Sequence, residues 1–197
     1  MSLIVYLETA EEELLLAGDS RLSYENDPNR HEDNIFKVFE YDGRVGIAFH
    51  GDADICGVSI ECIINDFIGE LEGNLTVYDA ACKLRECIQQ KKNDQDTWFY
   101  VLGFSSGEKE IYRFNVKRIG SKIDNVSASR YVSGEGDDFA WDIFKKEYKI
   151  NKPYIEALDF LKETFKRKMQ NDDTVGGDVD IILITKDEGL RWISRKS

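Results

Sequence analysis

Two opposite charges follow a short apolar run near the start of the chain. In the segment LLLAGDSRLS, residues 14–23, three leucines and an alanine lead into Gly18, Asp19, Ser20 and Arg21. A short apolar run that ends in glycine and polar residues is typical of a buried strand, and Asp and Ser favour turns. The segment alone therefore predicts a strand that ends in a turn, and it leaves open whether the carboxylate and the guanidinium also organise a charged site.

A second group of chemically capable residues is the run HGDAD, from His50 to Asp54. Histidine and alternating carboxylates on a loop can bind a divalent metal ion. A hydrolytic metal centre normally recruits further ligands, however, and the only other histidine is His31, in the polar loop YENDPNRHEDN. Asp54 fits better as the N-cap of a helix that starts near Ile55. The acidic run within residues 172–180 lacks the spacing of an EF-hand calcium loop. We therefore expect neither a metal ion nor another cofactor.

Size and charge narrow the function classes. A chain of 197 residues, 42% hydrophobic and 32% charged, is long enough for one well-buried core and short for two, so we expect a single domain over residues 1–197. A net charge of −12 repels phosphate backbones and anionic lipid head groups, which argues against nucleic acid and membranes as partners. No apolar stretch approaches the roughly 20 residues of a membrane span, and we expect a cytoplasmic protein.

The four cysteines give little support to a disulfide framework or a zinc site. They lie in two helix-like segments and show no CxxC spacing. We expect reduced, mostly buried thiols at Cys56, Cys62, Cys82 and Cys87.

The first half of the chain predicts two hairpins and two helices. The strands LIVYLE and ELLLAG flank the loop TAEE, and NIFKVFEY and RVGIAFHG flank Asp42 and Gly43, the strongest hairpin signal in the chain. Apolar residues then recur every three to five positions over residues 55–67 and 77–88, which indicates two amphipathic helices.

The second half repeats strands, helices and strands. Three strands are expected in TWFYVLGF, EIYRFNV and NVSASRYVS, the last over residues 125–133. Helices follow in DDFAWDIFKKEY and YIEALDFLKETFKRKM, and the strands VDIILITK and LRWIS close the chain. This order favours two packed sheets with helices outside over a parallel βαβ series.

Four segments give the chain a resemblance to a known family. They are LLLAGDSRLS, IFKVFEYDGRVGIAFHGDADI, YVSGEGDDFAW and DDTVGGDVDIILITKDEG. In this order and spacing the chain resembles a proteasome β-type subunit of the N-terminal nucleophile (Ntn) hydrolase superfamily, which includes the bacterial HslV-like branch. The resemblance spans nearly the whole chain. It implies an α+β fold, a four-layer αββα sandwich.

The resemblance also implies an N-terminal nucleophile. Such an enzyme uses the hydroxyl or thiol of its first residue as nucleophile and the α-amino group of that residue, with an intrinsic pKa of about 8, as base. Ser2 is the residue of the right type at the start, once Met1 is removed.

Four other positions take supporting roles by the same resemblance. Lys37 favours the neutral amine and lowers the pKa of the nucleophile, while Asp19 holds the Lys37 ammonium in place. Arg21 braces the turn. Backbone N–H groups at His50 and Gly51 supply an oxyanion hole, where a glycine permits close approach of a substrate carbonyl.

The implied function is a threonine/serine-type peptidase or amidohydrolase that cleaves peptide or amide bonds. Its implied partners are a peptide or unfolded-protein substrate, further copies of the chain in a homo-oligomer such as a ring, and an ATPase regulator. The alternative is a catalytically inactive proteasome-like assembly or structural subunit, in which Asp19, Arg21 and Lys37 form an ordinary, partly buried ion-pair cluster. Glu135 and Val175 stand where the family keeps two serines, which favours that alternative.

Overall fold

Two antiparallel sheets form the middle of the molecule. The computed structural model describes residues 2–24, 27–71, 73–91, 95–116, 122–126, 128, 130–134, 137–148 and 152–196. The β1 sheet contains, in spatial order, β12 (Arg130–Gly134), β1 (Leu3–Glu8), β2 (Leu14–Asp19), β13 (Val179–Thr185) and β14 (Gly189–Ser194). The β9 sheet contains β11 (Asp124–Asn125), β10 (Glu108–Asn115), β9 (Thr97–Ser105), β6 (Val45–Gly51) and β5 (Val38–Tyr41).

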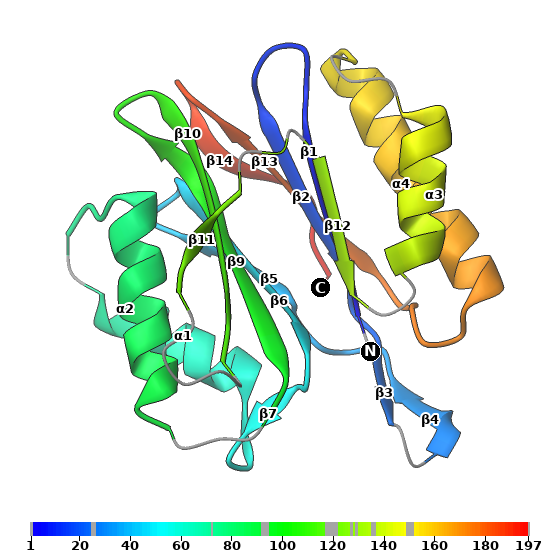
Figure 1. The fold of residues 1–197 in the computed structure, drawn as a ribbon, viewed down its shortest axis with the longest axis horizontal. Coiled ribbons are helices and arrows are strands. Elements are labelled where there is room, and N and C mark those ends of the chain that lie inside the picture. Colours follow the sequence, from blue (N-terminus) through cyan, green and yellow to red (C-terminus); the bar gives the residue numbers. More distant parts are fainter. Residues whose placement is uncertain are drawn as a thin grey trace.

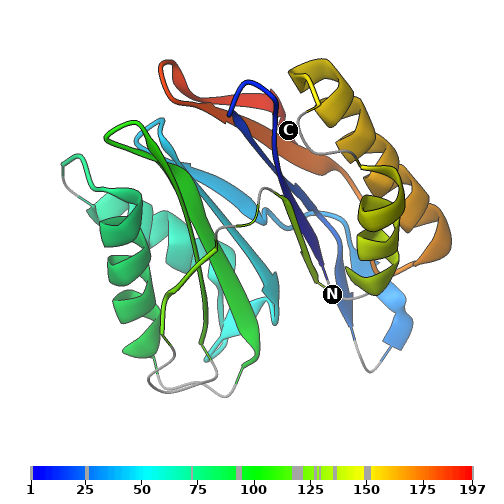
Figure 2. The same ribbon diagram turned by 45° about the horizontal axis from the view of Figure 1, so that its top comes forward.

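Helices cover both outer faces of this pair of sheets. As Figures 1 and 2 show, α1 (Ile60–Glu70) and α2 (Val77–Gln89) lie on the β9 sheet, whereas α3 (Asp137–Glu147) and α4 (Tyr154–Asn171) lie on the β1 sheet. The four-layer αββα sandwich predicted from the sequence is therefore confirmed. None of the helices in the described part of the chain is both long enough and apolar enough to cross a bilayer.

Three apolar layers hold the four structural layers together. Successive side chains of a strand point to opposite faces of its sheet. In β1, Leu3 and Val5 accordingly pack against α3 and α4, whereas Ile4 and Tyr6 pack between the two sheets. A third cluster, which includes Phe99, fills the space between the β9 sheet and its helices. Both faces of β1 are therefore buried, which explains why its sequence is a continuous apolar run.

The first helix begins later than its apolar spacing predicts. Ile55 belongs to a small hairpin of β7 (Asp54–Ile55) and β8 (Val58–Ser59), and its turn contains Gly57 with φ +75°. Asp54 does not cap α1: its carboxylate accepts the Gly57 N–H at 3.1 Å. The N-cap is Ser59, whose hydroxyl accepts the Cys62 N–H at 3.2 Å. The predicted helix start at residue 55 is wrong because Gly57 takes a turn conformation that interrupts the helical spacing.

The strand predicted over residues 125–133 is two strands in different sheets. β11 ends at Asn125 and pairs with β10, whereas β12 starts at Arg130 and pairs with β1. Residues 127 and 129, between them, lie outside the described residues. The alternating pattern is the same in both strands, so it could not indicate that the chain crosses from one sheet to the other.

Two further expectations are corrected. The polar loop after Arg21 contains a hairpin of β3 (Leu22–Tyr24) and β4 (Asp27–Glu32) that extends from the body of the fold (Figure 1). The cysteines are free but not mostly buried: Cys56 and Cys62 are exposed, and Cys82 and Cys87 are half-buried. Cys62 lies on the solvent face of α1 because the later start of the helix changes which residues face the sheet.

Candidate active site

The Asp19 carboxylate, at the end of β2, collects four hydrogen-bond donors from separate segments. Its Oδ1 accepts the Leu3 N–H at 2.8 Å and the Lys37 ammonium at 3.0 Å. Its Oδ2 accepts the backbone N–H groups of Arg21 at 3.3 Å and Gly176 at 3.2 Å. A buried carboxylate is stabilised in its ionised form by donors of this kind. We call Asp19, Leu3, Lys37 and Gly176 the Asp19 cluster.

Strand register brings the start of the chain to this carboxylate. β1 pairs with β2 so that Ile4 lies opposite Gly18, and the next position along places Leu3 beside Asp19. The loop between β1 and β2, residues 9–13, is closed by the Thr9 N–H, which donates to the Glu13 carbonyl at 2.9 Å. A slip of one residue in this hairpin would turn every β1 side chain to the opposite face.

Lys37 is one of the most buried charged residues of the described chain. Its side chain is 2% exposed and that of Asp19 is fully buried. The ammonium also donates to the Arg21 carbonyl. Burial lowers the pKa of Lys37 from its ordinary value of 10.5, and the Asp19 carboxylate opposes that shift. The result is an ammonium whose proton is easier to release than that of a surface lysine, held at a fixed position.

Ser2 lies one peptide bond from the Asp19 cluster, since the Leu3 N–H that binds Asp19 belongs to the Ser2–Leu3 peptide. It is 3% exposed. β12 passes close to it: Leu3 pairs with Gly134, and a Cβ at Gly134 would lie 1.7 Å from the Ser2 carbonyl oxygen. Gly134 also has φ +126°, so both space and backbone conformation require glycine there. The structure thus gathers Ser2, Asp19 and Lys37 at one end of β1.

The hydrogen-bond partners of the Arg21 guanidinium are Asp33 and the Asp173 carbonyl. The guanidinium forms a two-pronged pair with the Asp33 carboxylate, at 2.6 and 2.7 Å, and donates to the Asp173 carbonyl at 2.9 Å. The hydrogen bonds from Arg21 hold the pKa of Asp33 below its ordinary value. Arg21 therefore ties the end of β4 and the segment before β13 to the turn after β2. No local sequence pattern identifies Asp33 as the partner of Arg21.

Gly51 ends β6, opposite Thr97 of β9. It has φ +108°, and a Cβ there would lie 2.1 Å from the Asp96 carbonyl oxygen, so the close approach of Asp96 is enough to require glycine. The Phe49 N–H, two residues earlier, donates to the Lys37 carbonyl at 3.2 Å. Because alternate N–H groups of a strand point to the same edge, the Gly51 N–H faces the edge of β6 on which Lys37 lies.

His50 is a neutral group beside this site. Its ring stacks on Tyr100, with Nε2 at 3.3 Å from the Tyr100 hydroxyl. Burial lowers the pKa of His50 to about 4; the Asp96 carboxylate opposes the shift, and the Lys37 charge adds to it. The imidazole is therefore unprotonated near neutral pH.

The carboxylates of the HGDAD run serve the backbone. Asp52 accepts the Asp96 N–H at 2.7 Å, as Asp54 accepts that of Gly57. The acidic residues after α4 have similar uses, since Asp180 accepts the Lys196 N–H at 2.7 Å. Within the ranges that the structure describes, no three His, Cys, Asp or Glu side chains converge to hold a metal ion.

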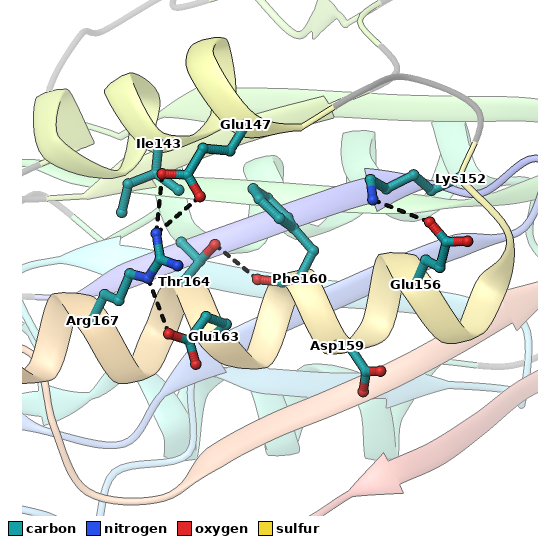
Figure 3. Close-up of a pocket in the computed structure, with 9 residues that line it drawn as sticks. All are labelled: Ile143, Glu147, Lys152, Glu156, Asp159, Phe160, Glu163, Thr164 and Arg167. Atoms are coloured by element: carbon teal, nitrogen blue, oxygen red, sulfur yellow. Dashed lines mark hydrogen bonds and ion pairs between the residues drawn. The ribbon is translucent and has the colours of Figure 1, made fainter.

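Two surface depressions lie away from the Asp19 cluster. One, of about 330 Å³, lies between α3 and α4, and in Figure 3 Arg167 reaches from α4 to Glu147 of α3 and to Glu163 of its own helix. The other, of about 460 Å³, lies among the turns that follow β5, β9 and β13. Of the two positions where the family keeps serines, Val175 is buried in the core beside α4 and Glu135 lies outside the described residues.

Comparisons with known proteins agree with this architecture. No family model matches the chain. A proteasome subunit beta from Thermoplasma acidophilum is 19% identical over 182 residues, which is 92% of this chain and 84% of that protein. Among solved structures, a mutant of Anbu from Hyphomicrobium sp. strain MC1 superposes with a TM-score of 0.76 at 14% identity, over 98% of this chain and 88% of the other. The chain therefore has the fold of a proteasome-like N-terminal nucleophile hydrolase.

Proposed function

We propose that this protein hydrolyses peptide or amide bonds with Ser2 as an N-terminal nucleophile. The observation that carries the proposal is the buried Lys37–Asp19 ion pair beside the first residues of β1. Asp19 of this pair accepts the N–H of the Ser2–Leu3 peptide. The sequence similarity to a proteasome subunit beta supports the same proposal. We also propose that residues 1–197 form one domain and that the protein is cytoplasmic.

The chemistry needs a free α-amine on Ser2, so Met1 must first be removed. The neutral amine then takes the proton of the Ser2 hydroxyl as Oγ attacks the substrate carbonyl carbon. Collapse of the tetrahedral intermediate breaks the C–N bond, and the departing amine takes up that proton. The remaining ester is hydrolysed by water, activated by the same α-amine, which restores the hydroxyl and releases the acid.

The neighbouring residues supply the electrostatics. A fixed Lys37 cation favours the neutral form of the amine and stabilises a developing alkoxide, and Asp19 keeps that cation in place. The Gly51 N–H is the proposed oxyanion donor. Arg21 acts at a distance, because its guanidinium holds the segments on which Asp19 depends.

A second candidate is a catalytically inactive proteasome-like assembly subunit. The observation that favours it is the burial of the site: Ser2 is 3% exposed, and the Lys37 ammonium already binds both Asp19 and the Arg21 carbonyl. A buried ion pair with satisfied partners can be structural alone.

The deciding experiment measures intact mass and hydrolysis together. Protein from its native source should lack Met1 and should cleave fluorogenic peptide amides, and Ser2→Ala should abolish that activity without changing thermal stability, since the change removes one oxygen atom. Ser2→Thr keeps the hydroxyl and should retain activity. Retained Met1 with no hydrolysis would favour the inactive subunit, and hydrolysis by Ser2→Ala would exclude this mechanism.

Assembly is part of the proposal. The archaeal relative is named as a subunit, and we propose that this chain forms a homo-oligomer, such as a ring, that receives peptides or unfolded protein and works with an ATPase regulator. Light scattering at micromolar concentration should report a mass of several chains. A monomer at every concentration and salt level would argue against an enclosed chamber.

A further inference from the structure

Residues 172–177, which lie between α4 and β13, contact the end of β2 through their main chain. The Gly176 N–H donates to the Asp19 carboxylate, and the Gly176 carbonyl accepts the Ser20 N–H at 3.3 Å. The Thr174 carbonyl accepts the Ser23 hydroxyl at 3.1 Å. The Asp19 cluster thus has one donor that comes from the segment between α4 and β13.

A buried lysine holds the start of this segment. Lys168, in the last turn of α4, is 3% exposed, and its ammonium binds the Asp172 carboxylate. Asp172 Oδ1 in turn accepts the Thr174 N–H at 2.9 Å and the Thr174 hydroxyl. One chain of polar contacts therefore runs from Lys168 through Asp172 to Thr174, two residues before Gly176.

Burial makes this lysine unusual. Of the described residues, Lys37 and Lys168 are the lysines in the buried class, and each binds an aspartate. Removing an ammonium from water is costly unless its contacts compensate. Both aspartates belong to the surroundings of the candidate site. Asp19 is the carboxylate at its centre, and Asp172 binds the segment whose Gly176 N–H is the fourth donor to Asp19.

We propose that Lys168 is a positioning residue for the candidate active site. Through Asp172 and Thr174 it holds the 172–177 segment against β2, so that the Gly176 N–H stays on Asp19 and the carboxylate keeps its orientation toward Lys37. The effect on catalysis rests on the proposed hydrolytic function, whereas the effect on the segment does not.

A purely helical role would act differently. A cation in the last turn of a helix stabilises the helix through its carbonyl end. Loss of that role would weaken α4 as a whole. The Gly176 amide would then exchange no faster, relative to wild type, than the amides of β13. The two roles therefore differ in which amide becomes exchangeable.

The test is amide hydrogen exchange on Lys168→Met, which keeps most of the side-chain volume and removes the charge. We expect the Gly176 amide to exchange about tenfold faster, while amides in the middle of β13 keep their wild-type rates. Lys168→Arg should restore slow exchange. Lys166→Met is the matched control, because Lys166 is on the same helix with a side chain 67% exposed, and it should change nothing.

Thr174→Val repeats the test without leaving a buried charge, and it decides the matter if Lys168→Met does not fold. It removes the hydroxyl donor to Asp172 and should also speed exchange at Gly176.

If the wild-type protein hydrolyses peptide amides, both variants should lower kcat about tenfold with little change in KM, since substrate contacts are untouched. Wild-type exchange at Gly176 in Thr174→Val and in folded Lys168→Met would overturn the inference. Absence of hydrolysis by the wild type would count against the proposed function alone.

Discussion

Two clusters of this molecule each pair a cation with carboxylate oxygens in opposite surroundings. At the end of β2, Lys37 and Asp19 are 3.0 Å apart with side chains 2% and 0% exposed. On the outer helices, Arg167 lies 2.9 Å from Glu147 and 3.0 Å from Glu163, with all three side chains between 39% and 48% exposed. The contact distances are nearly equal, so distance cannot distinguish the two clusters. Burial does, because water screens one and not the other.

The supporting contacts differ as well. Asp19 receives backbone N–H groups from Leu3, Arg21 and Gly176. The Arg167 guanidinium in Figure 3 instead binds the carboxylates of Glu147 and Glu163, which are side chains that can rotate into water. A cluster fixed by backbone donors keeps its geometry when the side chains fluctuate. Only the buried cluster is therefore suited to hold a reacting group in place.

The largest effect should come from breaking the buried pair. Lys37→Ala leaves the Asp19 carboxylate buried without its cation, and removing one partner of a buried ion pair costs about 3–5 kcal/mol. We expect the free energy of unfolding, measured by urea titration, to fall by that amount. A loss below about 1 kcal/mol would mean that water reaches Asp19 and that the contrast between the clusters is false. Because of this destabilisation, Ser2→Ala is the cleaner test of catalysis.

Acid should weaken the buried region through His50. The unfolded chain takes up a proton at His50 near pH 6.5, whereas in the folded protein its pKa is about 4. The stability tied to the neutral imidazole is therefore complete above pH 6.5 and is lost as the pH falls to about 4, by about 3 kcal/mol in total. His50→Gln should remove this part of the pH dependence of the free energy of unfolding. Equal slopes between pH 6.5 and 4 in both proteins would contradict the prediction.

A methyl group beside Ser2 should cost more than one at an exposed turn. Gly134→Ala forces a Cβ against the Ser2 carbonyl and a strained φ, and we expect a loss of about 1–3 kcal/mol or more in thermal unfolding. Gly57→Ala is the control: Gly57 also has a positive φ, but nothing lies within 4 Å of its added Cβ. The Gly57 variant should lose less. A similar loss of stability in the Gly134 and Gly57 variants would show that the strained φ alone determines the loss, and that the crowding beside β12 adds nothing to it.

The smallest effect is expected on the outer helices. Arg167→Ala removes an exposed pair, which is worth about 0–1 kcal/mol. Its effect should shrink further in 1 M NaCl, where the screening length is about 3 Å, while the Lys37→Ala effect should persist. Matched urea titrations at low and high salt would measure both. If the loss of unfolding free energy in Arg167→Ala did not shrink at high salt, the Arg167 pairs would be shielded from water like the Lys37–Asp19 pair.

The sequence predicts the elements that have strong local signals. The hairpin turn at Asp42 and Gly43, where both residues have positive φ, and the apolar stripes of α2 and α4 are found where the pattern places them. The wrong predictions arise where one local pattern fits two structures. The spacing around Ile55 fits a helix until the turn at Gly57 is considered, and the alternation over 125–133 is the same for one strand or two.

The site is less accessible to sequence reasoning. Asp19 and Lys37 are 18 residues apart, and their contact depends on how one sheet packs on the other, which only the family resemblance suggested. Nothing local pairs Arg21 with Asp33 or brings Gly176 to Asp19 across 157 residues. The roles of Ser2, Asp19, Arg21, Lys37 and Gly51 in catalysis stay predictions.

The order of strands in the β1 sheet has a consequence for biosynthesis. The β9 sheet is built from one continuous stretch, residues 38–125, whereas the β1 sheet joins β1 and β2 to strands that begin at Arg130 and Val179. Domains begin to form while the ribosome is still adding residues, and sequence-distant pairings form last. The hairpin of β1 and β2 therefore gains its neighbours β12 and β13 only after those later strands have been made, and the fourth donor of Asp19 arrives only when residue 176 has left the ribosome. The surroundings of Ser2 are therefore completed long after Ser2 itself has been made, because they include a donor from a segment far along the chain.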